Sequence, residues 1–389
     1  MNCRPARWTV LASSVLAVWL IADSRPSAAP QARQGLTGAP ELAQAYAAIM
    51  DGRFEAVPPL LDRTCGPAPR EACQLLESVN LWWQIQIDPF NRTRDGAFES
   101  QIDDAIAAIE AWTHREPLRA EAWFYLGGAY GARSQWRVLR GSRLAAARDG
   151  KRIKDSLERA LALDPGLTDA HFGIGLYRYY ADVAPAAVRM LQWLFLLPGG
   201  DRIGGLDAIN KARKGGLLLR SEADYQLHLL YLWYEKQPDA ALELLEDLIE
   251  RHPRNPHFQQ AAAELHDVYR SDPDASLKAW QSLLNAARAE RVAEPQMAEA
   301  AAQLGMALQL DRLSRSEEAL EPLRAVINAR PDAPFGAVAR AHLQIGDALE
   351  HLGRRREAMA SYQTAINTAG ADDPLRIASR ARAAMRAQR

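Results

Sequence analysis

The chain contains 389 residues, of which 47 are basic and 48 are acidic, so its formal net charge is −1. Hydrophobic residues make up 48% and charged residues 24%, which excludes a disordered, collagen-like or multi-span membrane protein. A charge so close to neutral argues against nucleic acid as the partner. Alanine, leucine, arginine and glutamate are abundant, whereas valine, isoleucine and threonine are sparse, so we expect an all-α protein.

The first 29 residues have the layout of a signal peptide. Arg4 and Arg7 precede fifteen consecutive uncharged residues, Trp8 to Ala22, and a segment of mostly small residues follows. A membrane-spanning helix needs about 20 apolar residues, so this stretch is short for a permanent anchor. We therefore expect residues 1–29 to be removed and the protein to be exported, either to the periplasm or out of the cell. An uncleaved N-terminal membrane anchor is the alternative.

Residues 30–80 predict a degenerate helical hairpin with a helical segment on either side of Gly52. The two cysteines outside the leader also lie in this region. They are Cys65 and Cys73, and they flank a proline-rich turn. In an oxidising compartment, two nearby cysteines around a turn are a candidate disulfide, and two small buried thiols are the alternative. No second cysteine pair or nearby histidine supplies further ligands, so no metal site is predicted.

Residues 81–236 form an irregular region that is rich in aromatic residues and arginine. It holds seven of the eight tryptophans outside the leader, namely Trp82, Trp83, Trp112, Trp123, Trp136, Trp193 and Trp233. Aromatic side chains supply large contact areas at a low cost in rotamer entropy, so the region as a whole predicts a recognition surface. For any single residue, packing in the core between irregular helices is the competing explanation.

Three arginines of this region, Arg133, Arg137 and Arg140, have the spacing of one helix face. The stretch 131–154 around them holds eight basic residues against a single acid, Asp149. A solvated face normally mixes charges of both signs, so this stripe predicts contact with an acidic partner. Compensation by acids of neighbouring helices is the alternative, and the candidates are Asp88, Asp103 and Asp104.

Further candidates for partner binding follow the arginine stripe. Tyr177 and Tyr180 lie in an aromatic cluster at the expected end of a helix. Tyr225 and His228 are three residues apart, so they share a helix face that lines a groove or packs into the core. The sequence contains no phosphate-binding loop, zinc-binding histidine pair or nucleophile elbow, so we expect a protein that is not an enzyme and holds no cofactor.

Residues 237–372 contain a regular repeat of small and large residues. Gly346 and Leu349 belong to one expected helix, and Ala358, Tyr362 and Ala365 belong to the next. This order resembles the tetratricopeptide repeat, a helix-turn-helix unit of 34 residues. The pattern recurs at Leu304 and Gly305, and with stretched turns at Trp123, Gly127, Leu157 and Ala160.

The resemblance implies a superhelical stack of antiparallel helix hairpins, an α-solenoid in which each unit contacts its neighbours. Residues 373–389 would then be a basic capping helix or tail. Because proteins of this class bind peptides or other proteins, we predict an exported, non-enzymatic scaffold for an acidic protein or peptide partner. The central aromatic and basic surface would bind this partner. An envelope glycan or a small anionic ligand is the alternative partner.

Overall fold

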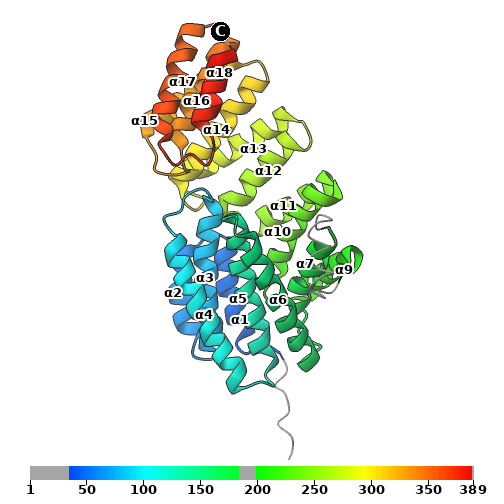
Figure 1. The fold of residues 1–389 in the computed structure, drawn as a ribbon. Helices are drawn as coiled ribbons and strands as arrows, with labels where there is room; N and C mark the ends of the chain where they lie inside the picture. Colours follow the sequence, from blue (N-terminus) through cyan, green and yellow to red (C-terminus); the bar gives the residue numbers. More distant parts are fainter. Residues whose placement is uncertain (1–34, 184–198, 388–389) are drawn as a thin grey trace, which may run out of the picture. The chain divides into compact units, whose positions relative to one another are not determined.

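The computed structural model describes residues 35–183 and 199–387, and every element in these ranges is helical. Successive helices pair as hairpins and stack in chain order from α1 to α18 (Figure 1). The predicted all-α stack of antiparallel hairpins is therefore confirmed. The predicted leader, residues 1–29, lies outside the described residues.

The hairpins follow one another along the chain. The first two pair α1 (Ala39–Met50) with α2 (Val57–Thr64), after a short 3-10 turn (Phe54–Ala56), and α3 (Arg70–Ile87) with α4 (Asp95–Arg115). The central ones pair α5 (Ala120–Leu139) with α6 (Arg143–Leu163), α7 (Ala170–Val183) with α9 (Arg202–Gly215), and α10 (Arg220–Leu230) with α11 (Pro238–Arg251). A π turn (Tyr231–Glu235) extends α10. The C-terminal ones pair α12 (Pro256–Val268) with α13 (Pro273–Arg288), α14 (Pro295–Arg312) with α15 (Ser316–Ala329), and α16 (Ala337–His351) with α17 (Arg355–Ala369), before α18 (Ile377–Ala387).

Proline and side-chain caps begin the helices of the C-terminal half. Four consecutive helices, α11 to α14, have proline in the first turn, where the missing N–H has no helical partner to lose. Asp272 accepts a hydrogen bond from the backbone nitrogen of Ala275 at 2.9 Å, which caps α13. Local sequence thus sets where these hairpins turn.

Glycine in one helix allows the partner helix to approach closely. A Cβ atom at Gly346 in α16 would overlap the ring of Tyr362 in α17, and one at Gly305 in α14 would overlap Trp280 in α13. In the central region, a Cβ atom at Gly127 would collide with Leu157 of α6. The repeated small and large residues of the sequence are therefore the contacts that close these hairpins.

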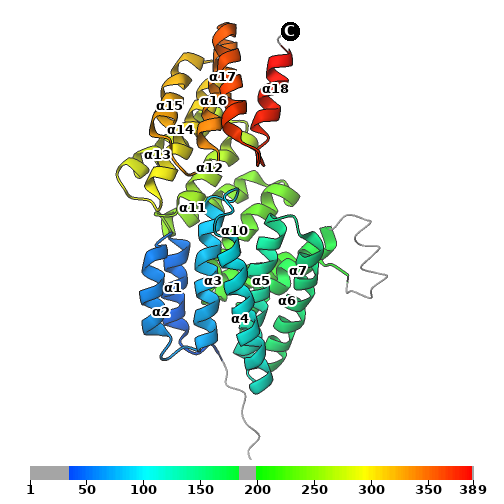
Figure 2. The same cartoon turned by 60° about the vertical axis from the view of Figure 1, so that its left-hand side comes forward.

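A continuous apolar core crosses from the irregular region into the regular repeats. Its buried residues run from Leu42 in α1 to Met297 in α14. Trp83 is fully buried within it, and its ring centroid lies 5.1 Å from that of Tyr225 and 5.7 Å from that of Phe258. At the other end, α18 buries Ile377 and Ala381 in a smaller core that also holds residues of α16 and α17, as expected of a capping helix (Figure 2).

Candidate functional site

The first arginine of the predicted stripe is buried between helices. Arg133 in α5 is only 8% exposed, and its Nε and Nη2 donate to the two carboxylate oxygens of Asp149 at 3.1 and 2.9 Å. Its Nη1 donates to Oδ1 of Asp103 in α4 at 2.6 Å. Because Asp149 is fully buried, it needs these charged donors. Arg133 therefore joins α4, α5 and α6 and does not face a partner.

The other two arginines of the stripe are used in the same way. Arg137 donates to Asp149 at 2.5 Å, and Arg140 binds both oxygens of Asp95 in α4 at 2.6 and 2.7 Å. The prediction of an open basic stripe is therefore wrong. Compensation by neighbouring acids is what the structure shows, although Asp95 and Asp149 take part with Asp103 in place of Asp88 and Asp104.

Tyr225 and His228 in α10 pack into the core. Their exposed fractions are 6% and 2%, and their ring centroids lie 4.9 Å apart. The Tyr225 hydroxyl shares a 2.9 Å hydrogen bond with Nε2 of His257. Burial lowers the pKa of His228 to about 3 and that of His257 to about 4, so both imidazoles are neutral at pH 7. These two predicted binding residues are inaccessible to a partner while the core is intact.

Most described tryptophans of the central region are also packed inside the protein. Trp82, Trp83 and Trp112 are buried, and Trp123 and Trp136 are half-buried. Trp193 lies outside the described residues. Trp233 differs from these because 49% of its surface is exposed. The aromatic content of residues 81–236 thus mainly reflects packing, which was the competing explanation.

An accessible aromatic cluster lies where α7 meets the π turn after α10. The rings of Tyr179, Tyr180 and Tyr234 contact one another pairwise, with centroids 5.8 to 5.9 Å apart and planes at 77° to 89°. Tyr179 is fully buried, whereas Tyr180 is 37% and Tyr234 is 39% exposed. Edge-to-face packing is favourable, so Tyr179 holds the other two rings in place. Tyr180 is thus the one predicted binding residue that reaches an open surface here, and Tyr177 is half-buried.

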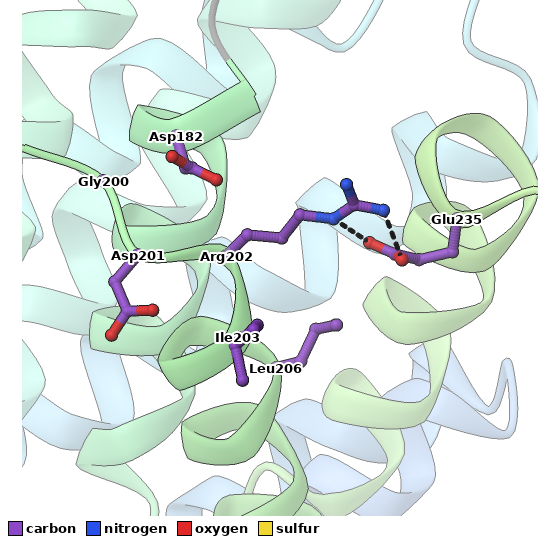
Figure 3. Close-up of a pocket in the computed structure, with 7 residues that line it drawn as sticks. All are labelled: Asp182, Gly200, Asp201, Arg202, Ile203, Leu206 and Glu235. Carbon is purple, nitrogen blue, oxygen red and sulfur yellow. Dashed lines mark hydrogen bonds and ion pairs between the residues drawn. The ribbon is translucent and has the colours of Figure 1, made fainter.

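A pocket of about 590 Å³ adjoins this cluster, between the end of α7, the start of α9 and the π turn (Figure 3). Arg202 reaches across it and binds the two oxygens of Glu235 at 2.8 and 2.6 Å. The Tyr179 hydroxyl also donates to Glu235. The lining residues are Asp182, Gly200, Asp201, Arg202, Ile203, Leu206 and Glu235.

The ion pair of Arg202 and Glu235 determines the protonation of this pocket. The hydrogen bonds from Arg202 hold the pKa of Glu235 below its ordinary value, so the carboxylate is charged at pH 7. Burial raises the pKa of Tyr179 and Tyr180, which keeps both hydroxyls protonated. Among the residues that the structure describes, no histidine or cysteine lines the pocket. Arg202 and Glu235 give the pocket a charged, hydrogen-bonding side, and Ile203 and Leu206 give it an apolar side.

Exposed apolar side chains lie in the segments that form this pocket. Ile203 is 76% exposed, and Trp233 and Tyr234 directly precede Glu235. We call Tyr180, Ile203, Trp233 and Tyr234, together with the pocket, the pocket surface. Sequence reasoning treated the turn before Arg202 as structural, and it counted Trp233 among the aromatic residues of the region without separating it from the tryptophans that are buried. Residues 233–235 are two aromatic residues and a glutamate in a row, and three consecutive helical residues cannot all point into the protein core. This pattern could have indicated that some of these side chains are exposed.

The remaining candidate sites are a disulfide, a metal cluster and a membrane span. Cys65 and Cys73 are joined by a disulfide with their Cα atoms 6.2 Å apart, at the turn between α2 and α3. Across residues 35–183 and 199–387, no group of three histidine, cysteine or acidic side chains could hold a metal ion. In the same ranges, no helix has the length and apolar character needed to cross a membrane.

The hairpin packing establishes the architecture. Gly127, Gly305 and Gly346 each lie against a large side chain of a paired or neighbouring helix, in units that stack on their neighbours. The fold is a tetratricopeptide-like α-solenoid. No protein-family model and no curated protein sequence matches the chain.

Solved structures similar to this α-solenoid share little sequence with it. The APC/C hetero-tetramer Cut9-Hcn1 is 12% identical over 89% of this chain and 55% of that chain, with a TM-score of 0.49. The chain thus spans about half the length of that neighbour. NprR in complex with its cognate peptide NprX is 12% identical over 90% and 82%, with a TM-score of 0.40. A Rap protein complexed with Competence and Sporulation Factor is 10% identical over 90% and 96%, with a TM-score of 0.45.

Proposed function

We propose that the chain is a non-catalytic scaffold that binds a protein or peptide partner through the pocket surface. The observation that carries this proposal is the exposure of Tyr180, Ile203, Trp233 and Tyr234 around an open pocket that holds Arg202. Exposed apolar clusters mark interaction sites, and tryptophan, tyrosine and arginine are enriched at the energetic centres of interfaces. The packed hairpins hold these side chains in place before the partner arrives, which lowers the entropy cost of binding.

The pocket surface favours a partner segment with an apolar or aromatic anchor. Ile203 and Leu206 give the pocket an apolar side, and the Arg202 side chain extends from beside them to Glu235 (Figure 3). Arg202, the basic side chain among the described lining residues, is already paired with Glu235. The acidic partner expected from Arg133, Arg137 and Arg140 loses its basis, because those arginines are paired with Asp95, Asp103 and Asp149. We therefore propose that an apolar or aromatic anchor, and not a net acidic charge, determines binding.

The alternative partner, an envelope glycan or a small anionic ligand, has less support. It required tryptophans that line an open surface, because sugar rings stack on exposed indoles. Trp82, Trp83 and Trp112 are instead buried in the core. Trp233 alone does not form a stacking platform of the expected kind.

The test compares the pocket surface with an equally exposed aromatic residue elsewhere. The double variant Tyr180→Ala, Trp233→Ala and the control Tyr269→Ala, whose side chain is 40% exposed at the end of α12, are prepared with the parent chain. Each is used to capture partners from envelope extract, and the partner is then purified for measurement of Kd. We expect the double variant to bind about 30-fold more weakly or worse, as for loss of a hot spot, with an unchanged melting temperature.

The control variant should bind like the parent chain. Retention of full affinity by the double variant would contradict the proposed surface. Equal weakening of partner binding by Tyr269→Ala would also contradict it, because the partner would then contact another part of the stack.

Export remains a proposal that the layout of residues 1–29 supports. We expect the mature chain to begin between residues 23 and 33. Intact-mass analysis of envelope or secreted material measures this start. A chain that begins at Met1 and needs detergent for its extraction would instead support the N-terminal anchor.

A further inference from the structure

The segment from Gly35 to Gly52 contacts several hairpins that come much later in the sequence. It comprises the residues before α1, the helix α1 and the two residues after it. Its contacts advance hairpin by hairpin: the first partners are Asp164 and Glu121 of the hairpin of α5 and α6, and the next are Glu222 in α10, Asn255 before α12 and Ala293 before α14. A peptide ligand that ran along a helical-repeat stack would make an ordered series of this kind.

Hydrogen bonds hold both ends of this segment. The backbone nitrogen and the hydroxyl of Thr37 donate to the two oxygens of Glu121 at 2.8 and 2.9 Å. At the other end, Nδ2 of Asn255 donates to the carbonyl oxygen of Met50 at 2.8 Å. The α1 segment is thus fixed at each end by side chains of hairpins later in the chain.

A single side-chain hydrogen bond holds the middle of the segment. The Tyr46 hydroxyl donates to Oε2 of Glu222 at 3.1 Å, and both residues are buried, with 6% and 4% exposure. No lysine or arginine among the described residues forms an ion pair with Glu222, which has Gln226 as a second donor. A buried carboxyl group without a cation needs hydrogen-bond donors, so α10 offers an acceptor that the tyrosine hydroxyl fills.

The apolar side of α1 completes the fit. Leu42, Ala45 and Ile49 are fully buried in the same core as Tyr225 and Phe258, whereas Ala47 on the other side of the helix is exposed. In the stack, α1 lies between its hairpin partner α2 and the next helix α3 (Figure 2). An amphipathic helix that places one face into an apolar groove is a recurring mode of peptide recognition.

We propose that residues 35–52 are an intramolecular ligand that fills a helix-binding face formed by α3, α5, α10 and the start of α12. This face selects an amphipathic helix with small and aliphatic residues on one side and a ring hydroxyl opposite Glu222. The same segment supplied as a separate peptide binds there once the chain's own copy is displaced. A partner on the pocket surface binds elsewhere and leaves this face filled.

Hydrogen exchange on the full, unmodified chain gives the first test. If residues 35–52 are a ligand, the amides of 42–50 exchange through an opening that leaves the amides of 258–265 in α12 protected. Identical exchange of the two segments under all conditions would overturn the proposal, because α1 would then open only when the whole stack unfolds. This measurement needs no variant.

Peptide binding gives the second test. Its two variants carry the same new charge on opposite sides of α1. Ala45→Asp places a charge on the fully buried side of α1, and Ala47→Asp places the same charge on its exposed side. The probe is a fluorescently labelled peptide of residues 35–52. We expect the Ala45→Asp chain to bind it at least about tenfold more tightly than the parent or the Ala47→Asp chain, whose face is occupied. A probe with Phe in place of Tyr46 should bind about tenfold more weakly.

Two outcomes of the peptide test overturn the proposal. One is a folded Ala45→Asp chain that binds no peptide, and the other is equal binding by the parent chain. If circular dichroism shows that Ala45→Asp is unfolded, the hydrogen-exchange result on the unmodified chain decides.

Discussion

The C-terminal hairpins and the central hairpins use the same close packing but differ in how far their contacts reach. In α16 and α17, Tyr362 packs against Gly346, and its hydroxyl lies 2.8 Å from a carboxyl oxygen of both Asp347 and Glu350, all within one hairpin. In the centre, Trp83 of α3 packs against Tyr225 of α10 and Phe258 of α12. In this regular hairpin the contacts join residues of the same hairpin. In the irregular region they join hairpins that are distant in the sequence.

The largest expected effect is on the free energy of unfolding when a tryptophan that packs between distant hairpins is removed. Trp83→Ala should lower the free energy of unfolding by about 3–5 kcal/mol, because it leaves a cavity between three hairpins. Trp123 is half-buried, with its indole nitrogen bonded to the exposed carbonyl of Pro117, so Trp123→Ala should cost less. Chemical denaturation measures both. If both variants lose the same unfolding free energy, the contacts of Trp83 between distant hairpins stabilise the protein no more than the local contacts of Trp123.

The next effect concerns the central arginines. Arg133→Ala should destabilise the protein by about 3 kcal/mol, because it leaves the buried charge of Asp149 without its main donors. The exposed pair of Arg354 with Glu357 in the C-terminal repeats supplies the control, and Arg354→Ala should melt close to the parent chain because solvent screens the pair. Thermal melting of both variants tests this contrast. If Arg133→Ala melts like the parent chain, the cluster of Arg133 and Asp149 does not hold the central helices together.

A third effect tests the packing inside a regular hairpin. Gly346→Ala should destabilise the protein by about 1–3 kcal/mol, since the added methyl group meets the ring of Tyr362. Gly150 in α6 has open space around it, so Gly150→Ala should stabilise by about 0.5–1 kcal/mol through helix propensity. Opposite signs in denaturant unfolding are expected. The same sign for both would show that Gly346 is not a contact position.

The smallest effect is a pH dependence of the central core. Burial lowers the pKa of His228 to about 3 from its ordinary 6.5, so the unfolded chain binds the proton at higher pH than the folded one. Stability from this residue is complete above about pH 6.5 and is lost, by about 1.4 kcal/mol per pH unit, as the pH falls toward 3. In the C-terminal repeats, the hydrogen bond to Asp311 raises the pKa of His351, which gives the opposite dependence.

A variant isolates this histidine, because burial also raises the pKa of Glu222 and so gives a slope of opposite sign. Between pH 7.5 and 5.5, the parent chain should lose about 1.4 kcal/mol more unfolding free energy than His228→Phe. Equal losses would show that His228 takes up its proton as readily in the folded protein as in the unfolded one.

Local pattern predicted the fold well and the candidate site poorly. Gly346, Tyr362 and the prolines at the helix starts act within one hairpin, so their spacing was enough to predict the stack. The arginine stripe has the spacing of one exposed face, yet Arg133 meets Asp103 of one helix and Asp149 of another. Tyr180 reaches the pocket surface and Tyr225 does not, although both lie in the same aromatic window. Spacing along a helix shows which residues share a face but not what that face contacts.

The all-α class and the turns of the regular hairpins follow from local sequence, because those depend on residues a few positions apart. Packing between helices, in contrast, sets which charges and aromatic rings remain available to a partner. Arg140 is paired with Asp95 of the preceding helix, whereas Trp83 packs against Phe258 and Tyr46 bonds to Glu222 across helices that are distant in sequence. Such contacts depend on how the stretched hairpins bring their helices together, and no local spacing specifies that arrangement.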